Sequence, residues 1–251
     1  MILFIGDLNC RYWLVNHITG IAEKQFNENV TAVLQLGDFG LFKTPLNAWF
    51  NGKGNNSFTR PVYFIDGNHE DFLFLKSLTT DFSSHFTHLP RGTVHNFNGF
   101  NFLCLGGAAY MDPVNTPSGA VIREEDIQAC MSHQPESVDV IITHDCPRDI
   151  GVPGNSGFEY CGPTGFSQSS LLRKHFTSKT WLFAHHHRFF EYKDAHGSCY
   201  GLPEAQNGFA VMDRKGRITM VEYRIENKDR PDDIETSGQI LCRNLEHCLT
   251  C

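Results

Sequence analysis

Short apolar runs recur along the chain, and polar residues follow each of them at once. The segments that contain such a run are 1–6, 31–38, 60–67, 137–145 and 180–187. An apolar run of four to eight residues bounded by turn residues is typical of a strand buried on both faces. We therefore expect five buried strands.

Between several of these strands, apolar residues recur every three to four positions, which is helical spacing. The expected helices are 11–30, 69–78, 123–133 and 167–178. The pair Asn98-Gly99 lies between two apolar runs and predicts a β-hairpin, and a second hairpin is expected over 208–225. Strands that alternate with helices, with hairpins among them, indicate an α/β fold with mixed sheets.

Residues that bind metal or carry protons follow the five predicted strands. They are Asp7 and Asn9, then Asp38, then Asn68 and His69, then His144, and finally His185 and His187. In α/β sheets the carboxyl ends of the strands are where ligands bind. Carboxylate, amide and imidazole groups suit Mn, Fe or Zn. Two such ions clamp a phosphate and lower the pKa of a bridging water, so the strand ends predict a two-metal site.

The chain has 251 residues and a formal net charge of −7. This length suits one large α/β domain, which we place over residues 1–225 and follow with a polar tail over 226–251. The first residues form a strand and not a leader peptide, and no apolar run reaches the length of a membrane span. We therefore expect a cytoplasmic protein without a membrane partner.

Nine cysteines are scattered along the chain, and this odd count favours reduced thiols in a reducing compartment. Four residues of the tail have the side chains of a zinc site: Cys242, His247, Cys248 and Cys251. The alternative is a frayed end with incidental thiols.

In chain order, the polar strand ends resemble the five sequence blocks of the calcineurin-like metallophosphoesterases. The blocks are Asp7-x-Asn9, Gly37-Asp38, Gly67-Asn68-His69-Glu70, His144 and His185-x-His187. The resemblance implies a four-layer α/β/β/α sandwich with two mixed β-sheets. It also implies hydrolysis of phosphomonoester or small phosphodiester bonds by attack of a metal-bound water or hydroxide at a dinuclear site.

The resemblance implies a role for each site residue. One metal ion would be held by Asp7, Asn9, Asp38 and His187, and the other by Asp38, Asn68, His144 and His185, so that Asp38 bridges them. His69 would be the catalytic residue, because it would protonate the leaving oxygen or stabilise the charged transition state. Glu70 and Asp71 are expected to cap a helix and orient their neighbours.

One position departs from the family pattern. The first block usually reads Asp-x-His, and here Asn9 takes the place of the histidine. An amide oxygen is a poorer ligand for zinc or iron than an imidazole. We therefore expect the first site to bind its ion more weakly, with Mn as the expected ion and Fe, Zn or Mg as the alternatives.

The segment His144-Asp145-Cys146-Pro147-Arg148 is similar to the His-Asp-x-Pro-Arg segment of the RNA lariat-debranching enzymes, which cleave phosphodiesters. This similarity keeps phosphodiesters among the candidate substrates. Arg148 is a candidate phosphate contact, and the alternative is an arginine exposed on a loop.

Two functions are open from the sequence. The first is a metal-dependent phosphoesterase that acts on a small phosphorylated substrate or nucleotide. The second is a binding scaffold on the same fold with impaired catalysis, which only Asn9 favours. The charge of −7 argues against long nucleic acids as partners. Specificity is expected from segments 40–60, 108–123 and 144–168, and the oligomeric state is open.

Overall fold

The computed structural model describes residues 1–154, 157 and 161–225. The first of its two sheets, sheet A, has the strand order β12-β11-β1-β2-β3-β4. Its strands are β1 (Ile2–Ile5), β2 (Ala32–Leu36), β3 (Val62–Ile65), β4 (Thr87–His88), β11 (Gly208–Met212) and β12 (Ile218–Glu222). The strands β1 to β4 pair in parallel, whereas β11 is antiparallel to both β1 and β12. Sheet A is therefore mixed.

The second sheet, sheet B, has the strand order β5-β6-β7-β8-β10-β9. Its strands are β5 (Thr93–Phe97), β6 (Phe100–Leu105), β7 (Val140–Thr143), β8 (Lys179–Phe183), β9 (Phe190–Asp194) and β10 (Gly197–Gly201). The four central strands run parallel, and hairpins add β5 and β9 in the antiparallel sense. The predicted hairpin at Asn98-Gly99 joins β5 and β6, and both of its turn residues have positive φ.

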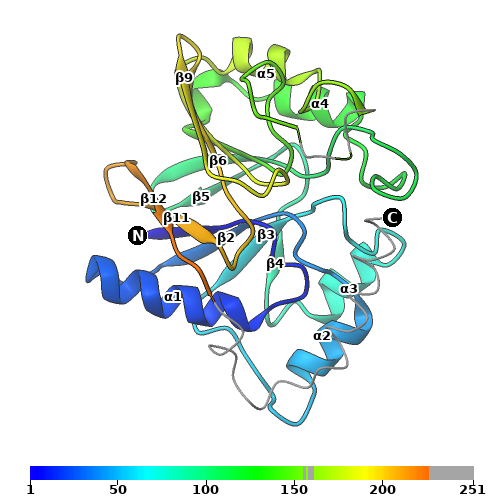
Figure 1. The fold of residues 1–251 in the computed structure, drawn as a ribbon, viewed down its shortest axis with the longest axis vertical. Coiled ribbons are helices and arrows are strands. Elements are labelled where there is room, and N and C mark those ends of the chain that lie inside the picture. Colours follow the sequence, from blue (N-terminus) through cyan, green and yellow to red (C-terminus); the bar gives the residue numbers. More distant parts are fainter. Residues whose placement is uncertain (155–156, 158–160, 226–251) are drawn as a thin grey trace.

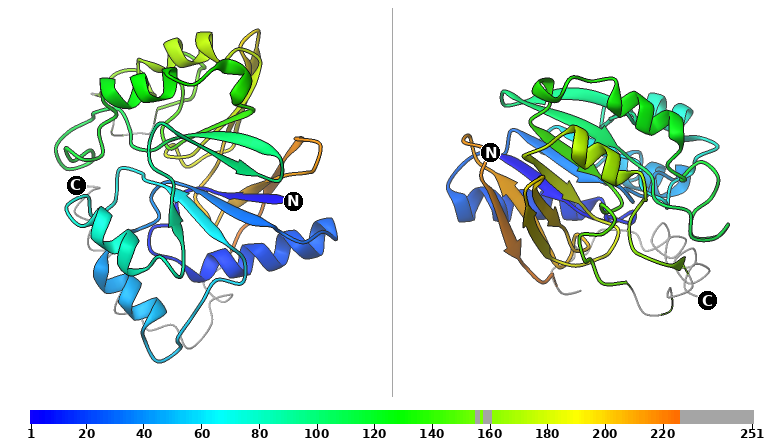
Figure 2. Two further views of the ribbon diagram at one scale, coloured as in Figure 1. Left: turned by 180° about the vertical axis from the view of Figure 1, so that it is seen from behind. Right: turned by 90° about the horizontal axis from the view of Figure 1, so that it is seen from above.

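Helices cover the outer face of each sheet (Figures 1 and 2). Those on sheet A are α1 (Trp13–Phe26), α2 (Lys43–Phe50) and α3 (Leu75–Asp81). Those on sheet B are α4 (Glu124–Met131) and α5 (Ser169–His175), with a 3-10 helix at Pro135–Ser137. None of the described helices combines the length and the apolar character that a membrane crossing requires.

Three separate apolar cores fill the spaces between these layers. Alternate residues of one strand enter different cores: Leu3 of β1 packs with Leu14 of α1, whereas Phe4 packs with Phe102 of sheet B. A third core joins sheet B to α4 and α5. Three cores require four layers, which confirms the predicted α/β/β/α sandwich with two mixed β-sheets.

A buried ion-pair network joins the two sheets close to the end of β3. Asp66 is 2% exposed and accepts hydrogen bonds from Nε and Nη2 of Arg91 at 2.9 and 2.6 Å. Nη1 of Arg91 donates to Asp126 of α4 at 3.1 Å. Burial opposes ionisation of Asp66, but His88 and Arg91 outweigh it and lower its pKa to about 2. The network fixes the end of β3, from which Asn68 extends, against sheet B.

Several local predictions were wrong. The helix expected over 69–78 begins only at Leu75, and α2, which lies within the segment 40–60, was not predicted. The hairpin of β9 and β10 was not predicted. Cys104, Cys130, Cys146 and Cys199 are free, as expected, but Cys10 is disulfide-bonded. The polar tail and its candidate zinc ligands lie outside the described residues.

Candidate metal centre

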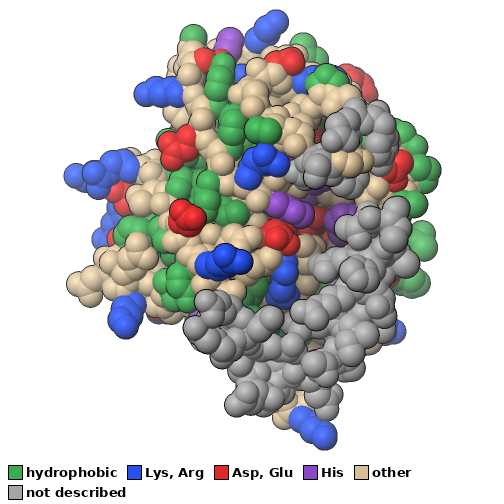
Figure 3. Space-filling model, viewed as in Figure 1, with side chains coloured by type: hydrophobic (Ala, Val, Ile, Leu, Met, Phe, Trp, Pro, Cys, Tyr) green, Lys and Arg blue, Asp and Glu red, His purple; other side chains and the backbone are tan. Residues whose placement is uncertain are grey.

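Three buried side chains from three strand ends meet between the sheets. One ligand atom each of Asp7, Asp38 and His144 lies within 4.8 Å of the other two. Asp7 and His144 are fully buried and Asp38 is 1% exposed. Histidine and acidic side chains lie together near the centre of the face in Figure 3. The parallel order of the strands thus brings residues together that are far apart in sequence.

Two glycines permit this close approach. A Cβ atom on Gly37 would collide with Nδ1 of His144, and one on Gly67 would collide with the Asp38 carboxylate. Gly37 also has φ +92°, a conformation that L side chains rarely adopt. The Gly-Asp and Gly-Asn pairs therefore let the ends of β2, β3 and β7 converge.

We use the name inner group for Asp38, Asn68, His144 and His185. Oδ1 of Asp38 accepts hydrogen bonds from the backbone N–H groups of Asn68 and His69, both at 2.9 Å. The same oxygen lies 3.5 Å from Nε2 of His144. The Asp38 carboxylate thus holds the polar end of β3 in place against the end of β7.

The orientation of His144 directs its Nε2 into the centre. Its Nδ1 lies 2.8 Å from the carbonyl oxygen of Leu36, which can only accept, so Nδ1 donates to it. Its Nε2 lies 2.8 Å from Oδ1 of Asn68. Nε2 of His144 and the side-chain oxygens of Asn68 and Asp38 therefore face one another. A histidine that ligates metal commonly donates its other N–H to a backbone carbonyl in this way.

His185 completes the inner group from the end of β8. Its ring centroid lies 4.9 Å from that of His144. Its backbone N–H donates to Oδ2 of Asp7 at 3.2 Å. Burial holds the pKa of His185 well below its ordinary value, so the ring is neutral and offers a lone pair.

We use the name outer group for Asp7, Asn9 and His187. Nε2 of His187 lies 3.4 Å from Oδ1 of Asp7, and the His187 side chain is 43% exposed. Burial acts to raise the pKa of Asp7, but His187, His144 and His185 outweigh it and hold that pKa below its ordinary value. Burial likewise acts to lower the pKa of His187, and the Asp7 carboxylate reverses this and raises it to about 9.

The donor set fits divalent cations. Oδ1 of Asp7 is buried and has no hydrogen-bond partner within the described part of the chain. Asp7 and Asp38 lie together, and within residues 1–154, 157 and 161–225 neither forms an ion pair with a lysine or arginine. Two buried carboxylates at one position are costly unless cations neutralise them.

The sequence model of the calcineurin-like phosphoesterases matches residues 1–208. The chain belongs to this family. No curated protein sequence was found to match it. The matched region ends at residue 208, but sheet A continues beyond it to the end of β12 at Glu222.

Solved structures share the calcineurin-like fold at low sequence identity. TT1561 of Thermus thermophilus has a TM-score of 0.57 and 11% identity, over 89% of this chain and 98% of that one. A putative 5'-nucleotidase from Staphylococcus aureus has a TM-score of 0.54 and 12% identity, over 98% of this chain and 58% of that one. The phosphopantetheinyl hydrolase of Mycobacterium tuberculosis has a TM-score of 0.50 and 11% identity, over 92% of this chain and 98% of that one. At these identities the likeness shows the fold alone.

In this calcineurin-like chain His69 lies beside the inner group. Its Nε2 lies 3.0 Å from the amide nitrogen of Asn68, which therefore donates to it. The same amide nitrogen lies 2.8 Å from the carbonyl oxygen of Asn115. The His69 ring is thus oriented by the side chain that contributes its oxygen to the inner group.

Glu70 has a different role from the predicted helix cap. Its carboxylate accepts backbone N–H groups of Phe39, Gly40 and Leu41 at 2.8, 3.1 and 2.6 Å. Burial and the nearby charge of Asp38 raise its pKa to about 8. Helix α3 starts later because Glu70 is used to hold the segment that follows Asp38.

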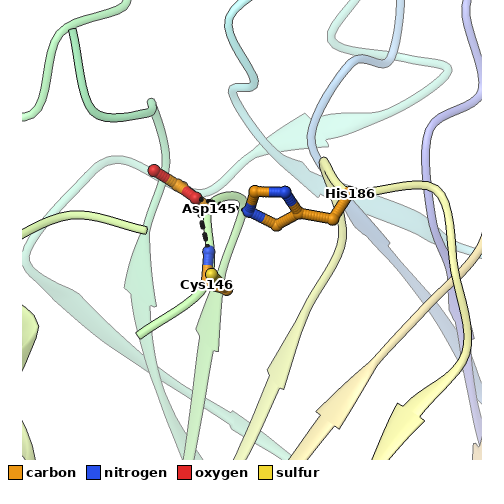
Figure 4. A group of neighbouring side chains, drawn as sticks. All are labelled: Asp145, Cys146 and His186. Carbon is orange, nitrogen blue, oxygen red and sulfur yellow. Dashed lines mark hydrogen bonds and ion pairs between the residues drawn. The ribbon is translucent and has the colours of Figure 1, made fainter. Parts of the chain in front are cut away.

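A second cluster, which we name the Asp145 cluster, consists of Asp145, Cys146 and His186 (Figure 4). No ligand or catalytic role was predicted for Asp145 or His186. The only signal in the sequence is their position, since each directly adjoins a predicted ligand. Nε2 of His186 lies 3.0 Å from Oδ1 of Asp145.

Arg148 uses its guanidinium within its own loop. Nε and Nη2 donate to the carbonyl oxygen of Gly165 at 3.0 and 2.9 Å. This contact ties Arg148 to Gly165. Of the aromatics in the expected specificity segments, Trp49 and Phe50 are buried in the core behind sheet A, whereas Tyr110 is 58% exposed.

Proposed function

We propose that this protein hydrolyses small phosphomonoesters or phosphodiesters with two bound divalent metal ions. The observation that carries this proposal is the convergence of Asp7, Asp38 and His144, whose ligand atoms lie within 4.8 Å in a buried position. Two structural relatives are named a putative 5'-nucleotidase and a phosphopantetheinyl hydrolase, and these names support the proposal.

The inner and outer groups would hold one ion each, and Asp38 would contribute to both. Divalent ions supply positive charge against the phosphate oxygens and lower the pKa of water. Mn²⁺ is the expected ion, because carboxylate, amide and imidazole ligands suit it. Asn9 offers only an amide oxygen, so the outer group would bind its ion more loosely.

His69 is the proposed catalytic residue. It lies at the edge of the inner group and is only partly buried, which is consistent with contact between its ring and a bound ester. The hydrogen bond from the Asn68 side chain fixes its orientation. In this position His69 would give a proton to the leaving oxygen or stabilise charge on the phosphoryl oxygens.

The surface around His69 favours a leaving group with an apolar or aromatic part. Among the described residues, four of the five exposed large hydrophobic side chains belong to the segments 73–74 and 110–114: Leu73, Phe74, Tyr110 and Val114. Leu73 and Phe74 lie four and five positions after His69 in the sequence. The other two belong to the loop whose Asn115 carbonyl accepts from Asn68 at 2.8 Å.

A variant pair tests this surface. Tyr110→Ser should raise KM for p-nitrophenyl phosphate about 2- to 10-fold, as loss of a ring contact of about 0.5–1.5 kcal/mol implies, with KM for glycerol phosphate unchanged. The control is Leu171→Ser, which changes the fifth exposed hydrophobic residue, on α5. Equal KM shifts for both substrates would refute a contact with the leaving group.

The function itself is tested with chelator-treated protein titrated with Mn²⁺. Hydrolysis of p-nitrophenyl phosphate and bis-p-nitrophenyl phosphate should appear as Mn²⁺ is added, and the preferred compound separates monoesterase from diesterase activity. If neither compound is hydrolysed at saturating Mn²⁺, the phosphoesterase proposal fails and the scaffold with impaired catalysis is the better account.

A further inference from the structure

The carboxylate of Asp145 joins three strand ends. Oδ1 accepts the backbone N–H of Cys146 at 2.7 Å and lies 3.0 Å from Nε2 of His186. Oδ2 accepts the backbone N–H of Ala109 at 2.9 Å. These partners follow β7, β8 and β6, respectively, and Asp145 is only 2% exposed.

Two of these strand ends carry proposed metal ligands. His144 directly precedes Asp145, and His186 lies between His185 and His187. Figure 4 shows the His186 ring directed at the Asp145 carboxylate. Fixing the distance between Asp145 and His186 therefore fixes the distance between His144 and the two histidines after β8.

The backbone at His186 requires such an anchor. His185 and His187 both have left-handed conformations, with φ of 65° and 54°. Residues other than glycine adopt this conformation at a cost, and it persists where surrounding contacts impose it. The contacts here are the His186–Asp145 hydrogen bond and the backbone bond from His186 N–H to the Ala184 carbonyl at 2.7 Å.

The hydrogen bonds of the Asp145 cluster argue against a third metal ion there. Both carboxylate oxygens already accept hydrogen bonds from N–H groups. The cluster is therefore complete without an ion.

We propose that Asp145 is a positioning residue, which through His186 sets the spacing between His144 and the His185–His187 segment and thereby the affinity of the centre for its ions. This inference rests on the proposed metal-dependent function. It assigns no contact with substrate to Asp145. Loss of such an outer hydrogen bond to metal ligands typically lowers metal affinity 10- to 100-fold.

The test compares His186→Gln with His186→Ala by calorimetric titration of chelator-treated protein with Mn²⁺. Glutamine places an N–H near the position of Nε2, so His186→Gln should keep nearly the wild-type affinity. His186→Ala removes the donor and should weaken Mn²⁺ binding about 10- to 100-fold. Asp145→Asn should do the same, with kcat at saturating Mn²⁺ within a few-fold of wild type.

Asp194→Asn is the control for a general loss of stability. Asp194 accepts hydrogen bonds from Arg173 and from the His196 backbone, at the end of sheet B opposite the centre. The Asp194→Asn change should lower the melting temperature without changing Mn²⁺ affinity. If Asp145→Asn does not fold, the His186 pair decides the question.

Three outcomes would overturn the proposal. His186→Ala and His186→Gln could bind Mn²⁺ equally well, or Asp145→Asn could match wild type. One fewer ion in both Asp145→Asn and Cys146→Ser would mean that the cluster is a metal site. A wild-type protein that binds no Mn²⁺ and hydrolyses neither test ester would instead refute the proposed function, which is a distinct result.

Discussion

The inner and outer groups of the candidate centre differ in how far hydrogen bonds of the chain fix them. In the inner group, Asp38 accepts two backbone N–H groups, and His144 is oriented by the Leu36 carbonyl at 2.8 Å. In the outer group, Asp7 has an unpaired buried oxygen, and His187 is 43% exposed.

This difference indicates that the inner group is more preorganised than the outer group, in which Asp7 accepts one backbone N–H through Oδ2. Side chains that are already oriented lose little conformational freedom when an ion binds. The outer group must order an exposed histidine, and it offers an amide where the family usually has an imidazole. Unequal affinities for two ions follow from this comparison, and the predictions below test it.

The largest effect is expected from Asp38, which would serve both groups. Asp38→Ala should lose both ions and all detectable hydrolysis, because it also leaves the N–H groups of Asn68 and His69 without their acceptor. Asp7→Ala should lose only the outer ion. Metal analysis of the purified variants measures this, with Asp71→Ala as the carboxylate control. An Asp38→Ala protein that retains two ions would refute the bridge.

His69 should affect turnover without affecting either group. His69→Ala is expected to lower kcat about 10²- to 10⁴-fold, the usual contribution of a general acid or base. Bound metal should stay at the wild-type level, since the ring is not a proposed ligand. Steady-state kinetics and metal analysis of one preparation measure both quantities. An active His69→Ala enzyme would contradict the proposed role.

The two groups should respond differently to pH. In the metal-free protein Asp7 raises the pKa of His187 to about 9, so a proton occupies the outer group at pH 7 and must leave when an ion binds. Outer affinity should therefore rise about tenfold per pH unit between pH 6.5 and 8.5, then level off above pH 9. His185 is neutral over this range and releases no proton.

Calorimetry in buffers of different ionisation enthalpy counts the released protons. The outer step should release about one proton from His187, and His187→Asn should abolish that release. A wild-type outer step without proton release would show that His187 is not a ligand.

The smallest expected change is a gain in the affinity of the outer group for its metal ion. Asn9→His restores an imidazole ligand and should tighten the outer step on the order of tenfold, about 1.4 kcal/mol. Asn9 has φ 48°, a conformation in which histidine is also found, so the backbone should accept the change. The metal affinity of the inner step should not change. If both steps shifted equally, the assignment of Asn9 to the outer group would be wrong.

The strands and their polar ends could be predicted because both signals are local in the sequence. An apolar run identifies each strand, and parallel strands place their carboxyl ends at one edge. Asp7 and Asp38 meet because β1 and β2 are parallel neighbours in sheet A, whereas His144 reaches them because sheet B packs against sheet A. The four layers followed from the family resemblance.

Features that depend on contacts between distant segments were missed. Nothing near Glu70 in the sequence shows that it binds the backbone of residues 39–41 and thereby delays α3. The Asp145–His186 hydrogen bond requires β7 and β8 to be neighbours, which their sequences do not reveal. The same holds for Arg148, whose partner Gly165 lies at the far end of its loop.

Titration of chelator-treated wild-type protein with Mn²⁺ tests the central claim most directly. The account predicts two ions per chain in two separable steps, a tight inner step and an outer step at least about tenfold weaker, with hydrolysis of p-nitrophenyl phosphate or its diester appearing as ions bind. Binding of no ion, or of two ions in a single step of equal affinity, would contradict it.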